Sequence, residues 1–164
     1  MNTKPIQPSA ILALPQANYS EAVRWASRRG YTEIVKLLLT DSRVDPSDVD
    51  PSDRDNLAII VASYWGQAEV VKLLLADSRV DPAARGNEAI GGASCRGYTE
   101  IVKLLLADSR VDPSTRNNEA SRVASYWGRI EIVKLLLADG RVDPSANNNE
   151  AIRDASRRGK TKVV

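Results

Sequence analysis

Histidine is absent from this chain of 164 residues, and cysteine occurs once, as Cys95. Without histidine, the chain cannot form a catalytic triad built on an imidazole or a zinc site that needs a histidine ligand. A single cysteine excludes an intrachain disulfide and a cluster of cysteine ligands, which agrees with a reducing compartment. We therefore expect neither enzymatic activity nor a bound cofactor or metal.

Long hydrophobic runs are lacking too, and the charges nearly cancel. No stretch approaches the about 20 apolar residues that a membrane span needs, and residues 1–16 lack the pattern of a signal peptide. We expect one globular domain in the cytoplasm, without membrane association. The 23 basic residues stand against 21 acidic residues, a balance too even to indicate a nucleic acid partner by itself.

What the sequence does contain is an internal repeat. The stretch at 30–47 recurs at 97–114 with one change in eighteen positions. When the copies are aligned on Gly30, Gly66, Gly97, Gly128 and Gly159, the spacings are 36, 31, 31 and 31 residues. Because VDPSD at 44–48 is duplicated at 49–53, the first copy is longer. We expect a capping segment at 1–19, then four full repeats and a truncated fifth, at about 20–55, 56–86, 87–117, 118–148 and 149–164.

Each copy has the pattern of two short helices joined by a turn. In the third copy, the first helix is predicted from Glu88 to about Arg96, with Asn87 as its N-terminal cap. Gly97 is expected to end this helix by adopting a positive φ. The second helix is predicted over 99–107, where the leucines form the apolar face. Since so small a helix pair cannot bury its own apolar face, the copies must stack into an all-α solenoid.

These residues resemble the ankyrin repeat family over 20–164. Ala93, Ser94 and Gly97 stand where the family has its alanine pair and its glycine, and EIVKLLL at 100–106 matches the long apolar second helix. The usual Thr-Pro-Leu-His opening is replaced by NEAI at 87–90. The unit is two residues shorter than usual, and it resembles arrays encoded by large DNA viruses of amoebae. The resemblance implies a helix-turn-helix solenoid.

The two positions before each glycine vary most between the copies, and we interpret them as the partner-binding site. They read Arg28 and Arg29, Tyr64 and Trp65, Cys95 and Arg96, Tyr126 and Trp127, and Arg157 and Arg158. The resemblance implies that they lie on a concave first-helix face that commonly contacts targets. Tyr, Trp and Arg are also enriched at binding hot spots. We expect a monomeric, non-catalytic scaffold for protein–protein interaction, whose arginines, together with Arg129, favour an acidic protein partner.

Two alternatives stay open at this point. Trp65 and Trp127 could lie flat against adjacent repeats as packing, because large aromatic side chains are usually well buried. Alternatively, interleaved aromatic and arginine side chains could bind RNA or single-stranded DNA by stacking. Protein binding is the reading that the near-neutral charge favours.

Two further sets of residues are expected to be structural. Trp25 shares a column of the alignment with Val61 and Val123, and we expect it in the core. A constant row of arginines follows a constant row of aspartates, which predicts a network of ion pairs. The row consists of Asp41 and Arg43, Asp77 and Arg79, Asp108 and Arg110, and Asp139 and Arg141.

Overall fold

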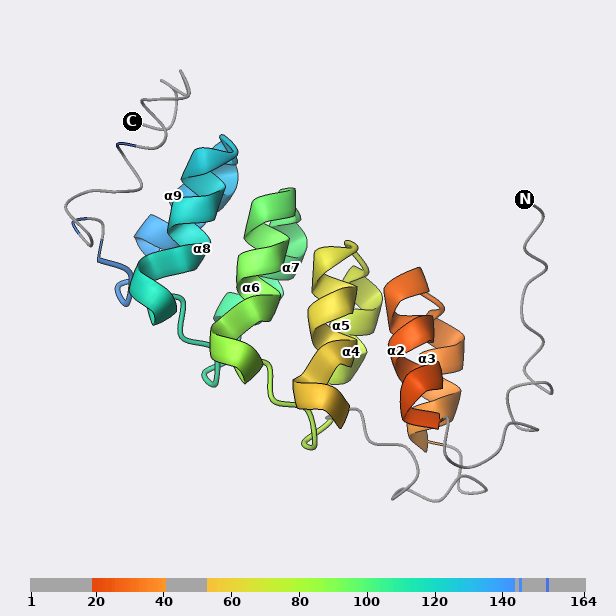
Figure 1. The fold of residues 1–164 in the computed structure, drawn as a ribbon. Coiled ribbons are helices and arrows are strands. Elements are labelled where there is room, and N and C mark those ends of the chain that lie inside the picture. The colour runs from red at the N-terminus through yellow and green to blue at the C-terminus, as the bar shows by residue number, and fades with distance from the viewer. Residues whose placement is uncertain (1–18, 41–52, 144, 146–152, 154–164) are drawn as a thin grey trace.

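The computed structural model describes residues 19–40, 53–143, 145 and 153, and these form four helix pairs. The first helices are α2 (Tyr19–Arg29), α4 (Asp53–Tyr64), α6 (Ala84–Arg96) and α8 (Thr115–Tyr126). The second helices are α3 (Thr32–Thr40), α5 (Ala68–Leu75), α7 (Thr99–Ala107) and α9 (Ile130–Ala138). No strand occurs in these ranges, so their fold is an all-α repeat solenoid, and the first helices form one layer in front of the second helices (Figure 1).

The core is a row of apolar layers, one for each helix pair. In each first helix, an alanine four residues before the glycine allows the neighbouring helices to approach closely; these are Ala26, Ala62, Ala93 and Ala124, all buried. The second helices bury branched side chains, such as Ile101, Val102 and Leu105 of α7. Each side chain of this size stabilises the fold by about 1.5–3 kcal/mol when it is fully buried.

The glycine that ends each first helix behaves as the sequence predicts. Gly97 has a φ of 88° in the left-handed region, and its N–H donates to the carbonyl of Ala93. A side chain here would also collide with the next repeat. A Cβ on Gly97 would lie 3.1 Å from Cδ of Arg129, and one on Gly66 would lie 2.8 Å from the ring of Tyr98. The glycines therefore serve both the turn and the stacking.

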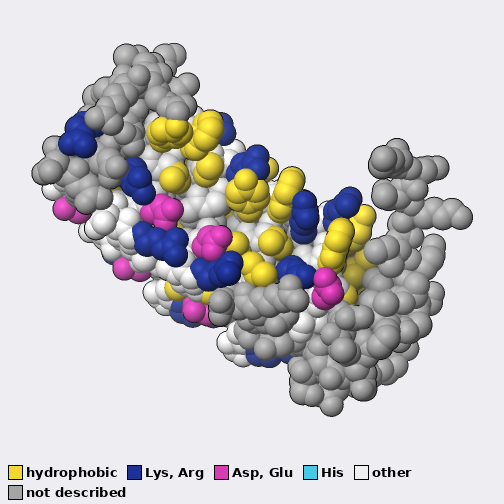
Figure 2. Space-filling model, in the orientation of Figure 1, with side chains coloured by type: hydrophobic (Ala, Val, Ile, Leu, Met, Phe, Trp, Pro, Cys, Tyr) yellow, Lys and Arg dark blue, Asp and Glu magenta, His cyan; other side chains and the backbone are white. Residues whose placement is uncertain are grey.

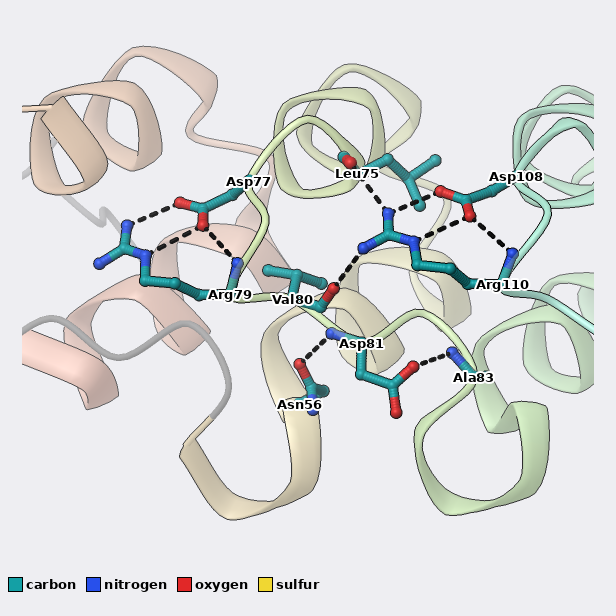
Figure 3. A network of polar contacts seen from close by, with 9 residues as sticks. All are labelled: Asn56, Leu75, Asp77, Arg79, Val80, Asp81, Ala83, Asp108 and Arg110. Carbon is teal, nitrogen blue, oxygen red and sulfur yellow. Dashed lines mark hydrogen bonds and ion pairs between the residues drawn. The ribbon is translucent and has the colours of Figure 1, made fainter.

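The predicted N-terminal cap at Asn87 is wrong, and the asparagine has a different partner. Asn87 ends a run of three left-handed residues, with a φ of 62°, and no side-chain cap precedes α6. Its Oδ1 accepts a hydrogen bond from the backbone N–H of Asp112 at 3.1 Å, in the turn that follows α7 in the same repeat. Asn56 accepts from the N–H of Asp81 in the same way, at 2.7 Å (Figure 3). Each of these side chains therefore ties the first helix of a repeat to the turn at the end of that repeat.

The expected row of ion pairs is confirmed in the three copies whose turns are described. Arg110 binds both carboxylate oxygens of Asp108, and its Nη atoms donate to the carbonyls of Val80 at 2.8 Å and Leu75 at 3.1 Å (Figure 3). These two carbonyls belong to the preceding repeat. The arginine therefore fastens its own turn to the one before it, and Arg141 repeats the arrangement.

Some expectations fall on residues outside the described ranges. They concern residues 1–18 of the capping segment, the pair of Asp41 and Arg43, and the fifth copy apart from Arg153, which includes Arg157 and Arg158. None of the helices in the described part of the chain has the length and apolar character needed to cross a membrane.

Candidate functional site

The candidate partner-binding residues lie at the C-terminal ends of the first helices, which form one face of the molecule. Tyr64 is 38% exposed, Trp65 43% and Trp127 48%. Figure 2 shows hydrophobic side chains next to Lys and Arg side chains over this end of the front helices. The two tryptophans are therefore exposed over nearly half of their surface, and the other half is covered.

Each aromatic pair has a defined internal geometry. The ring centroids of Tyr64 and Trp65 lie 5.8 Å apart with an angle of 75° between the planes. For Tyr126 and Trp127 the values are 5.3 Å and 79°. In this edge-to-face arrangement the positive edge of one ring meets the negative face of the other, which contributes about 0.5–1.5 kcal/mol. The two pairs thus present similar units two repeats apart.

Arginines from the neighbouring repeats enclose the pair on α4. Cζ of Arg28, on α2, lies 4.7 Å from the ring centroid of Trp65. Cζ of Arg96, on α6, lies 4.2 Å from that of Tyr64, and Nη2 of Arg96 donates to the Tyr64 hydroxyl at 2.5 Å. Cation–π contacts of this kind hold the side chains in one arrangement before any partner binds.

A comparison with models of protein families identifies the repeat. Residues 9–86 match a model of ankyrin repeats that describes three copies. The chain contains ankyrin repeats. The matched range includes the helix pairs α2–α3 and α4–α5, and the pairs α6–α7 and α8–α9 have the same layout. No curated protein matches the chain.

The charges on the front layer of the ankyrin repeats are divided between its two ends. Towards the N-terminal ends, each glutamate pairs with an arginine of its own helix; the pairs are Glu21 with Arg24, Glu88 with Arg85, and Glu119 with Arg116. At the C-terminal ends, Arg28, Arg29 and Arg96 form no ion pair with a described carboxylate. The exposed positive charge therefore lies among the aromatic side chains.

Two of the predicted site residues serve the stacking of the ankyrin repeats. Nε of Arg129 donates to the carbonyl of Cys95 at 3.1 Å, and the Arg129 side chain covers Gly97. Arg129 thus lies at the joint between the third and fourth repeats, on the two residues that flank Arg96. Cys95 is a partly exposed free thiol. Within the described ranges, no three His, Cys, Asp or Glu residues are grouped as they would be to hold a metal ion.

The prediction that Trp25 is buried is wrong, and this residue extends the exposed face of the first ankyrin repeat. Trp25 is 51% exposed, and Cζ of Arg29 lies 5.7 Å from its ring centroid. The two residues are four positions apart, so they share one face of α2. The spacing of four residues between Trp25 and Arg29 was the feature of the sequence that could have indicated an exposed tryptophan. Val61 and Val123, in the same column, are only partly buried.

Proposed function

We propose that the chain is a non-catalytic scaffold that binds a protein partner on the face formed by the C-terminal ends of α2, α4, α6 and α8 and the adjoining turns. Ankyrin repeats are generally modules for protein–protein interaction. The observation that carries the proposal is the exposed pair of Tyr64 and Trp65, held between Arg28 and Arg96. Rigid aromatic anchors lose little entropy on binding, so they suit an interaction hot spot.

The partner that we propose is acidic. Arg28, Arg29 and Arg96 place positive charge beside the aromatic rings, and no described carboxylate neutralises it. A partner carrying Asp or Glu around an apolar anchor would complement both features of the face. Charge of this kind mainly sets partner choice and the rate of association.

Affinity capture with the full chain tests this function. Captured proteins are compared for the wild type and for a variant with Trp65→Ala and Trp127→Ala, each with and without nuclease. The matched control replaces Leu37 and Leu137 with alanine, because these residues are similarly exposed, at 43% and 47%, but lie on α3 and α9. Circular dichroism first establishes that all three forms are folded.

The proposal predicts proteins that are retained by the wild type and the leucine control, lost by the tryptophan variant and unaffected by nuclease. Loss of every captured protein on nuclease treatment would instead favour binding of RNA or single-stranded DNA. Equal capture by the tryptophan variant and the wild type would show that the binding face lies elsewhere.

A further inference from the structure

The joints between neighbouring first helices are not equivalent on the exposed face. Arg28 of α2 lies over Trp65, which directly follows α4, and Tyr64 of α4 contacts Arg96 of α6. In both joints, the residue two before one glycine meets the residue just before the next glycine. The corresponding positions between α6 and α8 hold Cys95 and Trp127. A small side chain therefore stands at the third joint where the first two have an arginine or a tyrosine.

Gly91 lies four residues before Cys95, on the same side of α6, and it adds open space there. The alignment places it with Arg24, Ile60 and Arg122, and Ile60 is only 6% exposed. A Cβ built on Gly91 would meet nothing within 4 Å, whereas one on Gly92 would lie 3.3 Å from Tyr64. Gly91 has no positive φ, and glycine inside a helix is destabilising relative to alanine. Packing within the chain thus accounts for Gly92 but not for Gly91.

The two ends of the face carry different side chains. Arg28 and Arg96 bracket the aromatic pair on α4 and form no ion pair with a described carboxylate. Towards α8, the described end of the face has Trp127, which is 48% exposed, with its ring edge-to-face to Tyr126. The face therefore has Arg28 and Arg96 around the aromatic pair over α2 to α6, whereas between α6 and α8 it has Trp127, an open backbone position and Arg129, which is held on the Cys95 carbonyl.

We propose that this face recognises an acidic peptide segment in two parts. Carboxylates of the segment meet Arg28 and Arg96, and one large apolar side chain of the segment lies over Gly91 beside Trp127. This inference rests on the proposed function and adds to it the composition of the partner and its placement along the face. The arginines at one end of the face favour carboxylates in the peptide, and the open position at Gly91 favours an apolar side chain.

Selection from a phage-displayed library of random peptides of about 12 residues, with the full chain as bait, tests the composition. The expected outcome is enrichment of Asp and Glu around a single Trp, Phe or Leu. The dissociation constant of the best peptide is then measured by fluorescence anisotropy. Enrichment of Lys and Arg, or no enrichment of any sequence, would overturn the inference.

Three variants test the placement of that peptide. Gly91→Ile, which copies Ile60, fills the open position and should weaken binding at least tenfold while leaving the thermal unfolding temperature unchanged or higher. Gly140→Ser is the matched control, since Gly140 also has open space at its Cβ position and aligns with Ser78 and Ser109 in the turns. It should change binding less than twofold. Arg28→Gln with Arg96→Gln should weaken binding at least tenfold and flatten its dependence on salt.

A peptide whose apolar residue is changed to alanine closes a double-mutant cycle with Gly91→Ile. If the apolar residue lies over Gly91, the two changes together should weaken binding much less than the product of their separate effects. Independent effects, or binding that Gly91→Ile leaves within twofold, would contradict the inference. Should Trp65→Ala with Trp127→Ala still abolish binding in that case, the proposed function would stand while the inference fails. If neither Gly91→Ile nor the double tryptophan variant weakens binding, both the inference and the proposed function are wrong.

Discussion

The guanidinium of Arg110 donates a hydrogen bond to the carbonyl oxygen of Val80, thirty residues earlier in the chain, at 2.8 Å. The same side chain is held in place by Asp108 of its own turn, through Nε at 2.9 Å and Nη2 at 2.6 Å. The aspartate therefore orients the arginine, and the arginine joins two repeats. In the turns along the stack, this contact is both an ion pair and a bond between repeats.

We predict that Arg110→Lys destabilises the fold, because a lysine cannot reach two carbonyls and a carboxylate with one planar fork. The expected loss is about 1–3 kcal/mol of unfolding free energy, measured by urea denaturation followed by circular dichroism. As a control, Lys103→Ala removes a surface pair to Glu100 at 3.9 Å and should change the value by less than about 0.5 kcal/mol. Equal effects of the two substitutions would show that the bonds to the preceding repeat contribute nothing.

Stability should fall in acid. Hydrogen bonds from Arg79, Arg110 and Arg141 lower the pKa of Asp77, Asp108 and Asp139 below the value of a free aspartate. Groups with a lowered folded-state pKa stabilise the fold above the unfolded pKa of about 3.9, and this contribution is lost as the pH falls through the folded pKa. We expect a nearly constant unfolding free energy from pH 7 to about 5 and a decline below about 4. Urea denaturation across this range measures it, and Asp108→Asn should make the decline shallower.

Replacement of Asn87 by glycine should destabilise the fold less than replacement by alanine. Either change removes the bonds from the side chain to the N–H of Asp112 and to the hydroxyl of Thr115. Alanine must also adopt the left-handed φ of 62°, which glycine does without strain. We expect a loss of about 2–3 kcal/mol for Asn87→Ala and about 1 kcal/mol less for Asn87→Gly. Thermal and urea unfolding would rank the two variants, and the reverse order would contradict this account.

Replacement by alanine should change the free energy of unfolding in opposite directions at Gly91 and at Gly97. Gly91→Ala should raise the unfolding free energy by about 0.5–1 kcal/mol, because the site is helical and a Cβ there meets no atom. Gly97→Ala should lower it by about 1–2 kcal/mol, because φ is 88° and Arg129 lies 3.1 Å from the new Cβ. Differential scanning calorimetry of both variants checks the signs. Destabilisation by Gly91→Ala would mean that the position over α6 is not open.

Much of the fold could be predicted because repetition reveals which residues are structural. The constant glycines predicted the helix ends, and the constant Asp and Arg rows predicted the ion pairs. The helix over 99–107 was predicted with the bounds that α7 has. The partner of Asn87 could not be predicted in this way, since it lies 25 residues ahead and depends on how the turn after α7 folds back towards the start of α6.

The candidate site was predictable in its residues but not in their arrangement. Variation among the copies singled out Tyr64, Trp65 and Arg96, yet only the structure places Arg96 over Tyr64. Trp25 was assigned to the core because its column holds valines, and valines can be only partly buried in a helix of this kind. The open space around Gly91 could not be predicted, because it depends on how the neighbouring helices pack.

The bonds within and between repeats have one more consequence, which concerns how such an array can change in length. The asparagine reaches 25 residues ahead, and the arginine reaches 30 and 35 residues back. The asparagine bond therefore ends within its own unit, and the arginine bonds end in the unit before it. Recombination between two near-identical copies that removes or adds 31 residues would reconnect every one of these bonds to an equivalent atom. Gene rearrangement could thus exchange one row of the exposed face at a time while the framework keeps its joints.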